Sequence, residues 1–313
     1  MVIVIGDINV DVMMAVSHWP NEGGDALAHT VTWSNGGTGL NAATAIGRMG
    51  GQVRLWGRIG TDAAAKQITA FAAGARIELH DIQHDAHVAT GLCVIPVTPS
   101  GERTFLSFRG ANQYWHMPEQ WPTTPGWLMV CGHALLSDPQ RHHSIHALQF
   151  AQQHGWQTVI DMCEPLTDHL ANIMSALPQP LTLLCGNEAE MQALAALPLA
   201  SYAHICITKR GAAGASAVSA SDTWHAPAFV VEACDTTGCG DTFVAVCSLA
   251  LAHGATVPQA LLVANAAGAL TASRRGAADI LPTHADVCAL LQQHAHALPT
   301  WLVQLAHPDN TRH

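Results

Sequence analysis

VIVIGDINVDV, residues 2–12, places four apolar residues before Gly6 and polar residues after it. A continuous apolar run of this kind predicts a strand that is buried on both faces of a parallel sheet. Ligands of such sheets bind outside the carboxyl ends of the strands, so Asp7, Asn9 and Asp11 are candidate site residues. In an extended chain Asn9 and Asp11 share one side, where their donor and acceptors suit vicinal hydroxyls. Turn formation is the alternative explanation, because Asp and Asn favour turns.

Strand-like and helix-like segments alternate along the rest of the chain. Apolar strand-like runs occupy 53–60, 127–132, 158–162, 181–186 and 204–208. Helix-like segments occupy 40–50, 64–74, 142–155 and 188–197. This alternation predicts an α/β fold with an open, mostly parallel central sheet and helices on both faces.

Two segments, about 11–35 and 88–112, interrupt this alternation. The second contains a PSGE turn between two β-rich runs, which is typical of a hairpin. We expect both segments to build a small antiparallel β-sheet that covers a ligand cleft as a lid, with ordinary edge hairpins as the alternative. The expected organisation is one domain over 1–298 and a polar C-terminal tail over 299–313 that frays.

Composition excludes several classes of function. Hydrophobic residues make up 49% of the 313, enough for a sizeable core, and the formal net charge of −10 disfavours nucleic-acid binding. No apolar run of about 18 residues indicates a membrane span, and the N-terminus lacks signal-peptide features. We expect a cytoplasmic protein whose nine cysteines are small buried hydrophobes. The histidine-rich segment 80–87 is expected to be a solvated loop, with a metal site as the alternative.

A glycine cluster, GGTGLNAATAIGRMGG (36–51), precedes the first helix-like segment. Glycines let backbone N–H groups approach a ligand, and a helix N-terminus favours anions or polar oxygens. Tight packing of helix on sheet explains the small residues equally well.

DTTGCGDTF (235–243) combines a glycine turn with two acids at the start of another helix. The amides of Gly238, Cys239 and Gly240 are expected to form a concave anion hole for a phosphoryl group, aided by the helix dipole. Asp241, in the first turn, is placed to accept the proton of an attacking hydroxyl. An Asp that only stabilises the helix N-terminus is the alternative. Cys239 is expected to be a small buried filler; the alternative is a modifiable thiol, whose pKa the helix N-terminus would lower.

Other phosphate-binding classes lack their motifs here. The chain has no Gly-Lys-Ser/Thr loop, no H-R-D or D-F-G triplet and no G-x-G-x-x-G after its first strand. Walker A NTPases, protein kinases and dinucleotide-binding dehydrogenases are therefore disfavoured.

DTTGCGDTF resembles the second signature of the PfkB (ribokinase-like) family of carbohydrate and nucleoside kinases, and GGTGLNAATAIGRMGG resembles the first. GDINVD, NEAE (187–190) and KRGAAG (209–214) are similar to further family elements, in family order, so the resemblance spans roughly 1–295. It implies an ATP-dependent kinase acting on an alcohol, with a Rossmann-like core and a β-sheet lid. Cys239 departs from the alanine usual in that turn.

The resemblance also implies a role for each matching residue. Asp241 becomes the catalytic base, and the amides of Gly238, Cys239 and Gly240 the anion hole. The expected substrate-binding residues are Asn9, Asp11, Gly36, Gly37, Thr38 and Asn41. The expected ATP-binding residues are Asn187, Lys209, Gly211, Gly214 and Asn265, with 274–277 at the adenine and ribose edge. Glu190 is expected to act on Mg²⁺ through water, and Asp235 and Thr237 on K⁺ or another monovalent cation.

Two further substrate-binding candidates are Arg109 and His133. Arg109 lies beside the expected lid, where it suits a carboxylate or phosphate, although a solvated Arg is the alternative. Ribose-specific members of the family often carry Lys at the Thr38 position and an acid near His133, and this chain has neither, which disfavours ribose.

The favoured substrate is a sugar or sugar derivative, phosphorylated at a primary hydroxyl. A nucleoside kinase is the alternative and needs a second, base-sized pocket, while a sensor of sugar or nucleotide without turnover is a third hypothesis. A phosphosugar is disfavoured because basic residues are scarce. Exposed lid strands invite edge pairing, so a homodimer through the lid is a further expectation.

Overall fold

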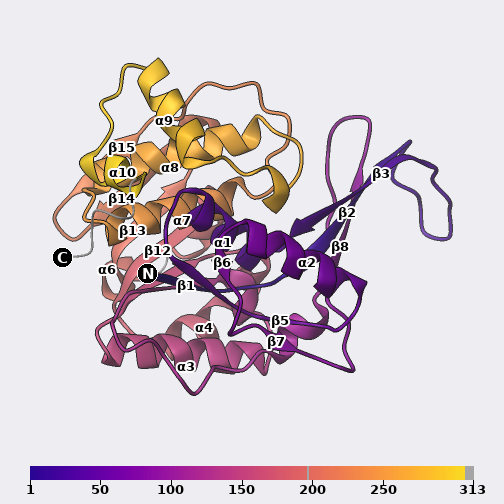
Figure 1. The fold of residues 1–313 in the computed structure, drawn as a ribbon, viewed down its shortest axis with the longest axis horizontal. Coiled ribbons are helices and arrows are strands. Elements are labelled where there is room, and N and C mark those ends of the chain that lie inside the picture. Colours follow the sequence, from indigo (N-terminus) through magenta and orange to yellow (C-terminus); the bar gives the residue numbers. More distant parts are fainter. Residues whose placement is uncertain (196, 307–313) are drawn as a thin grey trace.

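The computed structural model describes residues 1–195 and 197–306 and confirms the α/β architecture with a separate small sheet. A nine-stranded sheet in the order β15-β14-β13-β12-β11-β10-β1-β4-β6 forms its centre (Figure 1). Its parallel strands are β1 (Val2–Ile5), β4 (Val53–Trp56), β6 (Ile77–Glu78), β10 (Trp127–Cys131), β11 (Gln157–Asp161), β12 (Leu181–Asn187) and β13 (Ala203–Lys209). The sequence pattern did not reveal β14 (Ala215–Ser219) and β15 (Thr223–Ala226). Strand β14 pairs antiparallel with β13, and the edge strand β15 pairs antiparallel with β14.

Strand β1 shows why the core has two halves. All four of its residues are buried, and alternate side chains enter different clusters. Val2 and Val4 belong to one cluster and Ile3 and Ile5 to the other, as the period of two requires. The predicted helices on both faces are therefore confirmed.

Helices cover the sheet in two layers (Figure 1). The first cluster receives α1 (Thr38–Arg48), α2 (Ala63–Gly74), α7 (Cys239–Ala252), α8 (Val257–Ala272), α9 (His284–Gln293) and α10 (Thr300–Leu305). The second receives α3 (Gln140–Gln153), α4 (Leu170–Ala176) and α5 (Glu188–Ala193), and α6 (Leu199–Tyr202) lies at its margin. Helix α5 ends earlier than the expected 197. Within these described ranges, no helix is long and apolar enough to cross a membrane.

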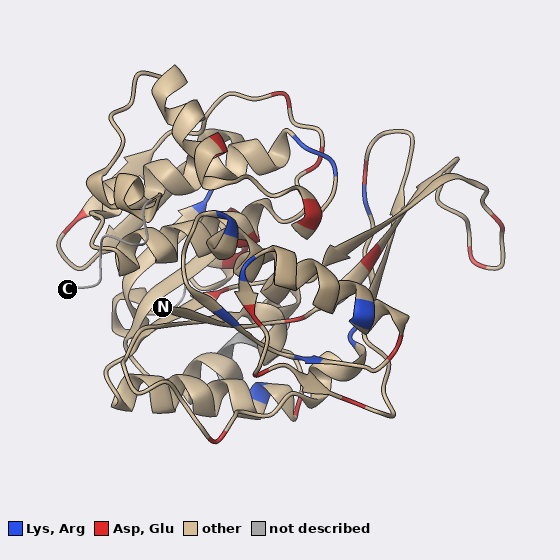
Figure 2. Cartoon of the chain, in the orientation of Figure 1, with Lys and Arg blue, Asp and Glu red and all other residues tan. Residues whose placement is uncertain are grey.

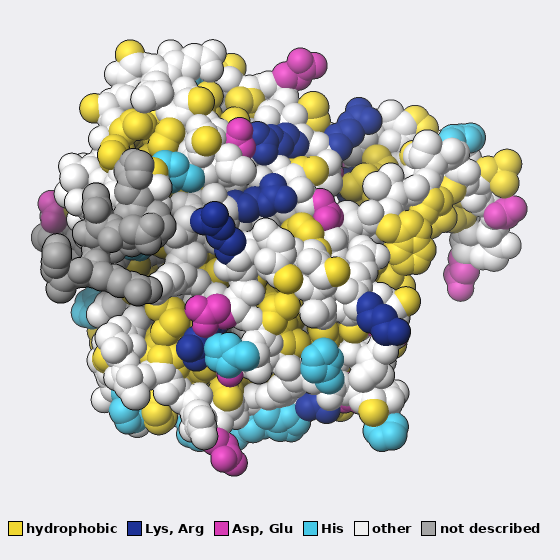
Figure 3. Space-filling view, in the orientation of Figure 1, with side chains coloured by type: hydrophobic (Ala, Val, Ile, Leu, Met, Phe, Trp, Pro, Cys, Tyr) yellow, Lys and Arg dark blue, Asp and Glu magenta, His cyan; other side chains and the backbone are white. Residues whose placement is uncertain are grey.

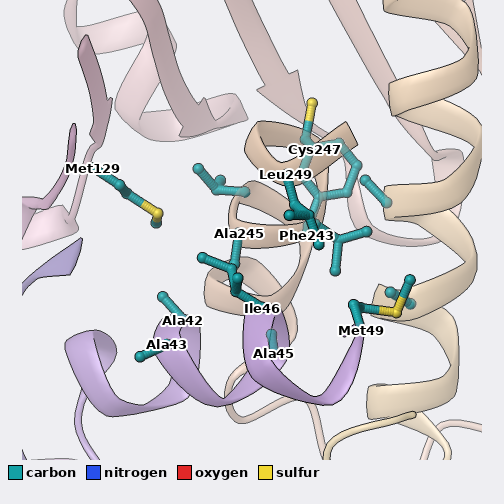
Figure 4. Close-up of a cluster of buried hydrophobic side chains, with 14 of the residues drawn as sticks. Ala42, Ala43, Ala45, Ile46, Met49, Met129, Phe243, Ala245, Cys247 and Leu249 are labelled. Atoms are coloured by element: carbon teal, nitrogen blue, oxygen red, sulfur yellow. The ribbon is translucent and has the colours of Figure 1, made fainter. Parts of the chain in front are cut away.

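Helices α1 and α7, which carry the two glycine motifs, pack directly on each other. Ala42, Ala45 and Ile46 of α1 face Phe243 and Ala245 of α7 (Figure 4). Small side chains on α1 allow this close approach. The packing fixes the N-termini of both helices relative to each other.

The expected lid is a four-stranded sheet that projects from the body as an arm (Figure 1). It has the order β3-β2-β8-β9, with β2 (Asn9–Val16), β3 (Ala28–Gly36), β8 (Gly91–Val97) and β9 (Leu106–Phe108). Each of the two expected excursions forms an antiparallel pair, β2 with β3 and β8 with β9. The two pairs join through a parallel contact between β2 and β8.

The histidine-rich segment 80–87 is only partly a loop. The segment 80–87 contains a short strand, β7 (Gln83–His84), paired with β5 (Arg58–Ile59), and its three histidines are exposed. No group of His, Cys, Asp or Glu within the described residues suits a metal ion.

The expectation that the tail frays after Leu298 is wrong for α10, because Trp301 and Leu302 are buried against the core. Residues 307–313 of that tail lie outside the described residues.

The cysteines mostly follow the expectation of buried fillers. Five are buried and three are half-buried, and none of the nine forms a disulfide. Only Cys234 of the nine is exposed. Cys234 lies on the loop before α7, outside the hydrophobic core.

The contact between Gly6 and Gly39 gives the first prediction. A Cβ on Gly39 would lie 2.6–2.8 Å from backbone atoms of Gly6, closer than real contacts allow. We expect Gly39→Ala to lower the free energy of unfolding by about 1–3 kcal/mol in urea denaturation. The control is Gly74→Ala at the end of α2, where a Cβ meets nothing within 4 Å. Equal stability of both variants would show that the close approach is unimportant.

Candidate active site

The candidate residues gather at the carboxyl edge of the parallel strands. Chain order reverses around β1, whose neighbours are β4 on one side and β10 on the other, so this edge contains a topological switch point. Each strand here ends in or just before a polar residue. These residues are Asp7 after β1, His133 after β10, Asp161 in β11, Asn187 in β12 and Lys209 in β13.

Gly238 shapes the turn at the start of α7. It is the N-cap residue and adopts a left-handed conformation, with φ of 75°, which glycine tolerates best. Cys239 and Gly240 then open the helix, so their amides lie in its positive N-terminal turn. The Cys239 amide donates to the Thr236 carbonyl across a long 3.3 Å contact. One of the three amides expected to form the anion hole is therefore already bonded within the turn.

Asp241 lies half-buried in the first turn of α7. Its Oδ2 accepts a hydrogen bond of 2.8 Å from Nδ2 of Asn41, on α1. Burial raises the pKa of Asp241, while the Asn41 hydrogen bond and the nearby Lys209 and His133 oppose that rise. A carboxylate whose pKa is raised in this way is better suited to take a proton than a solvated one.

Lys209 lies beside the anion turn and is paired with a buried acid. Its Nζ donates to Oδ1 of Asp161 at 2.6 Å, and it lies 3.2 Å from the place that a Cβ on Gly240 would take. Burial alone would lower the pKa of Lys209, but Asp161 outweighs burial and raises it. The ammonium therefore stays charged next to Gly240. Asp161 was not expected from the sequence; its only signal is an acid that ends an apolar strand.

Asn187 and Glu190 form the capping box of α5. The Asn187 side chain accepts from the Glu190 amide at 2.9 Å, and Glu190 Oε2 accepts from the Asn187 amide at 2.7 Å. Glu190 is buried. This arrangement uses Oε2 and leaves Oε1 for a magnesium-bound water, so the pair fits an indirect role at Mg²⁺ better than direct coordination.

Asp11 and Asn9 lie where the lid leaves the body. Asp11 is buried and packs against Gly36, where a Cβ would lie 2.0 Å from its Oδ2. Burial and three nearby carboxylates, those of Asp241, Asp279 and Asp235, raise the pKa of Asp11 to about 7. The Asn9 side chain accepts from Asn112 at 2.9 Å.

Gly37 and Thr38 begin α1 against the β1–β2 connection. Gly37 has φ of 90°, and a Cβ there would lie 2.5 Å from the Asp7 carbonyl. The Gly39 amide donates to that same carbonyl at 3.0 Å. The first glycine motif therefore serves close packing at this point, and it also brings Thr38 and Asn41 to the carboxyl edge.

Arg109 is held inside the molecule. Its guanidinium binds both oxygens of Asp7, at 2.8 and 2.9 Å, and also contacts Ser137 and Gln140. The side chain is 14% exposed, so the alternative of a solvated Arg is wrong. Asp7 accepts two of these four hydrogen bonds, and Ser137 and Gln140 accept the other two. Arg109 thus reaches a carboxylate as expected, but that carboxylate belongs to the protein.

Unpaired polar atoms mark the region around Asp241. Among buried side-chain atoms, Oδ1 of Asn41 and Nδ1 of His133 have no hydrogen-bond partner. Buried polar atoms without a partner are rare and costly. Both belong to residues expected to bind substrate, but both atoms are buried from solvent, and such unpartnered atoms also occur elsewhere in the described residues, for example at Ser144 and Trp301.

Two of the residues expected to bind ATP contact the loop at 226–228. Asn265 of α8 donates to the carbonyls of Ala226 and Pro227 at 2.9 and 3.0 Å. Gly214 packs against the same loop and has φ of 86°, while Gly211 has φ of 54°. Asn265 and Gly214 position the backbone around 226–228, whereas a Cβ on Gly211 would meet nothing within 4 Å.

The side chains of Asp235 and Thr237 accept hydrogen bonds from an arginine of the lid. Arg103, in the β8–β9 turn, donates to Oδ1 of Asp235 and, at 2.7 Å, to Oγ1 of Thr237. No sequence signal pointed to Arg103, because 132 residues separate it from Asp235.

A cleft of about 390 Å³ lies between the lid and this loop, and its lining includes Thr32, Ser34, Arg103, Asp235 and Gly276. Asp241 is not part of that lining.

The alternative of an acidic Cys239 thiol is wrong. Burial, followed by the carboxylates of Asp235 and Asp241, raises the pKa of Cys239 to about 12. The positive end of α7 is too weak to offset desolvation and two adjacent negative charges.

The chain matches a known protein family over most of its length. A family model described as pfkB family carbohydrate kinase matches residues 1–284. The chain is 29% identical over 276 residues to a fructokinase of Klebsiella pneumoniae, covering 80% of this chain and 90% of that protein. It is 28% identical over 303 residues to a ribokinase of Bacillus subtilis, covering 92% and 98%.

Solved structures share the fold. The structure of a Burkholderia thailandensis nucleoside kinase in complex with inosine superposes with a TM-score of 0.81 at 19% identity, covering 95% of this chain and 98% of that one. Because the family match spans nearly the whole chain and includes both glycine motifs, this chain belongs to the pfkB family of carbohydrate kinases.

Proposed function

We propose that this protein transfers the terminal phosphoryl group of ATP to a primary hydroxyl of a sugar or sugar derivative. The observation that carries the proposal is Asp241, a half-buried carboxylate with a raised pKa beside the glycine turn that opens α7. Its partner Asn41 comes from the other glycine motif, so the two motifs meet at the proposed reacting atoms. Fructokinase and ribokinase relatives support a sugar as the acceptor.

In this proposal Asp241 orients the acceptor hydroxyl and takes its proton as the oxygen attacks. Asn41 fixes the carboxylate through its 2.8 Å hydrogen bond. The amides at 238–240 receive the negative charge of the transferred group, and the nearby Lys209 ammonium supports them. Glu190 would hold Mg²⁺ through a water molecule, and the ion would supply further charge neutralisation.

Substrate recognition falls to Asn9, Asp11 and Asn41, with Gly36 to Thr38 lining the same region. Asn41 Oδ1 and His133 Nδ1 need partners that a polyol provides. Arg109 acts through Asp7 in this scheme, by holding the β1–β2 connection in place.

The first test is a substrate panel with an Asp241→Asn variant. ADP release is measured with free sugars, nucleosides and phosphosugars. We expect stimulation by free sugars and a loss of about 10²–10⁴-fold in kcat/KM for Asp241→Asn, as for removal of a general base. The matched control is Asp222→Asn, an exposed Asp on the β14–β15 turn, which should keep full activity.

Other results of this test have distinct meanings. If Asp241 served only the helix N-terminus, Asp241→Asn would lower thermal stability and keep its rate per folded molecule. Stimulation by nucleosides alone would favour the nucleoside kinase, and no ATP consumption with any acceptor would favour a sensor.

A second prediction concerns pH. Asp241 must be ionised to act as a base, so kcat/KM falls as the pH drops through its pKa, which burial raises above 3.8. Asn41→Ala removes a hydrogen bond that lowers this pKa, and we therefore expect the acid limb of the profile to move to higher pH. Asn21→Ala, exposed at the tip of the lid, is the control. An acid limb that stays in place when Asn41 is removed would contradict the assignment of Asp241.

We also propose that the lid pairs two copies of the chain. Trp33, Val12, Val94 and Leu106 form one cross-strand row and therefore lie on one face of the lid. Trp33 is 63% and Leu106 51% exposed. Figure 3 shows hydrophobic side chains along the arm.

The proposed dimer is tested by light scattering after gel filtration. Trp33→Lys is expected to shift a dimer to a monomer, because it places a charge in the apolar face. Trp19→Lys, another exposed tryptophan of the same excursion that lies outside this row, is the control. A monomeric parent protein at micromolar concentration would refute the pairing.

A further inference from the structure

Arg103 lies in an unusual position for a residue of a hairpin turn. It belongs to the turn between β8 and β9, where its backbone forms a bridge with Val97. Residues 99–108 are otherwise all exposed, but the Arg103 side chain is only 21% exposed. The side chain turns from the arm toward the body of the protein, and Figure 2 shows a basic segment on this arm facing the loops above α7.

The guanidinium of Arg103 binds the turn that precedes the proposed anion hole. It donates to Asp235 Oδ1, to Thr237 Oγ1 at 2.7 Å and to Thr236 Oγ1 at 2.5 Å. All three acceptors belong to consecutive residues. One charged side chain thus holds the whole 235–237 segment.

Asp235 links that segment to a third part of the chain. Its side chain is 5% exposed, and it also accepts from the Thr237 amide at 2.9 Å and the Gly276 amide at 3.2 Å. A buried carboxylate with three donors is well satisfied only while its cation stays in place. Arg103 is the cation that forms an ion pair with it.

A monovalent metal ion does not fit the same side-chain oxygens. The family resemblance places the cation on Asp235 and Thr237 partly through backbone carbonyls; the side-chain oxygens of these residues, Oδ1 of Asp235 and Oγ1 of Thr237, already accept hydrogen bonds from Arg103. A second positive charge at those atoms would lie within hydrogen-bonding distance of the guanidinium, and like charges that close repel strongly.

We propose that Arg103 is the built-in cation of the 235–237 turn, so that this enzyme holds its anion hole without K⁺ or another monovalent ion. Arg103 is a positioning residue: it acts through Asp235 and Thr237 on the amides that follow at 238–240. Because Arg103 belongs to the lid, the position of the lid and the conformation of the phosphate-binding turn are coupled. The inference rests on the proposed function for its effect on rate, but its effect on the turn is independent of turnover.

The test compares the parent protein with Arg103→Met and Arg103→Lys in KCl and in tetramethylammonium chloride. Hydrogen exchange is followed by mass spectrometry in peptides that cover 235–240 and 274–278, and thermal unfolding is measured alongside. The parent protein should give the same exchange and the same Tm in both salts. Arg103→Met should exchange faster in tetramethylammonium and recover in KCl, with a K⁺-specific rise in Tm of about 2–4 °C.

The control and the conservative variant separate charge from packing. Glu102→Gln changes an exposed charge on the same turn and should match the parent protein in both salts. Arg103→Lys keeps the charge and should retain most of the protection in tetramethylammonium. Initial rates with the best acceptor should follow the same order, with Arg103→Met at least tenfold slower without K⁺ and rescued by it.

Three results would overturn the proposal. They are a K⁺-specific gain in the parent protein, unchanged exchange in Arg103→Met, and faster exchange in that variant that K⁺ does not restore. The last would make Arg103 a latch of the lid with no role as a cation. Absence of kinase activity in all proteins would count against the proposed function alone, because exchange and Tm report on the turn directly.

Discussion

The burial of carboxylates at one edge of the sheet is the constraint on which this site depends. Buried acids are tolerated when a cation or several donors satisfy them. Asp7 is paired with Arg109, Asp161 with Lys209 and Asp235 with Arg103. Glu190 accepts from a backbone amide in the capping box.

Two acids at this edge, Asp11 and Asp241, form no ion pair within the described residues; Asp241 is the proposed base and Asp11 is assigned to substrate recognition. The pKa of Asp11 is raised to about 7 and that of Asp241 is raised as well, in both cases first by burial. An ion pair does not abolish this effect of burial, because the pKa of Asp161 is also raised to about 7 beside Lys209. Groups with shifted pKa values concentrate at functional sites, and these three carboxylates lie at one edge of the sheet.

Sequence patterns revealed the parts of this arrangement that depend on neighbouring residues. Continuous apolar runs located β1, β10 and the next three parallel strands, because burial on both faces requires them, and glycine spacing located the N-termini of α1 and α7. Arg103, Asp161 and Arg109 acquire their meaning from partners 48 to 132 residues away, which no local pattern encodes. Cys239 shows the limit of a local rule: a helix N-terminus alone favours an acidic thiol, but burial and two carboxylates outweigh that effect here.

The ion pairs at this edge of the sheet also affect which substrate the site can accept. A phosphosugar would need cations with spare donors near Asp241 and Asn41. Lys209 and Arg109, the basic residues that reach this edge from β13 and from the base of the lid, are each committed to a buried acid. Removing either cation from its acid would leave an unpaired buried carboxylate, which costs several kcal/mol. A neutral polyol asks only for hydrogen-bonding groups, and Asn41 and His133 have atoms free to provide them. The electrostatics of the edge therefore favour an uncharged acceptor.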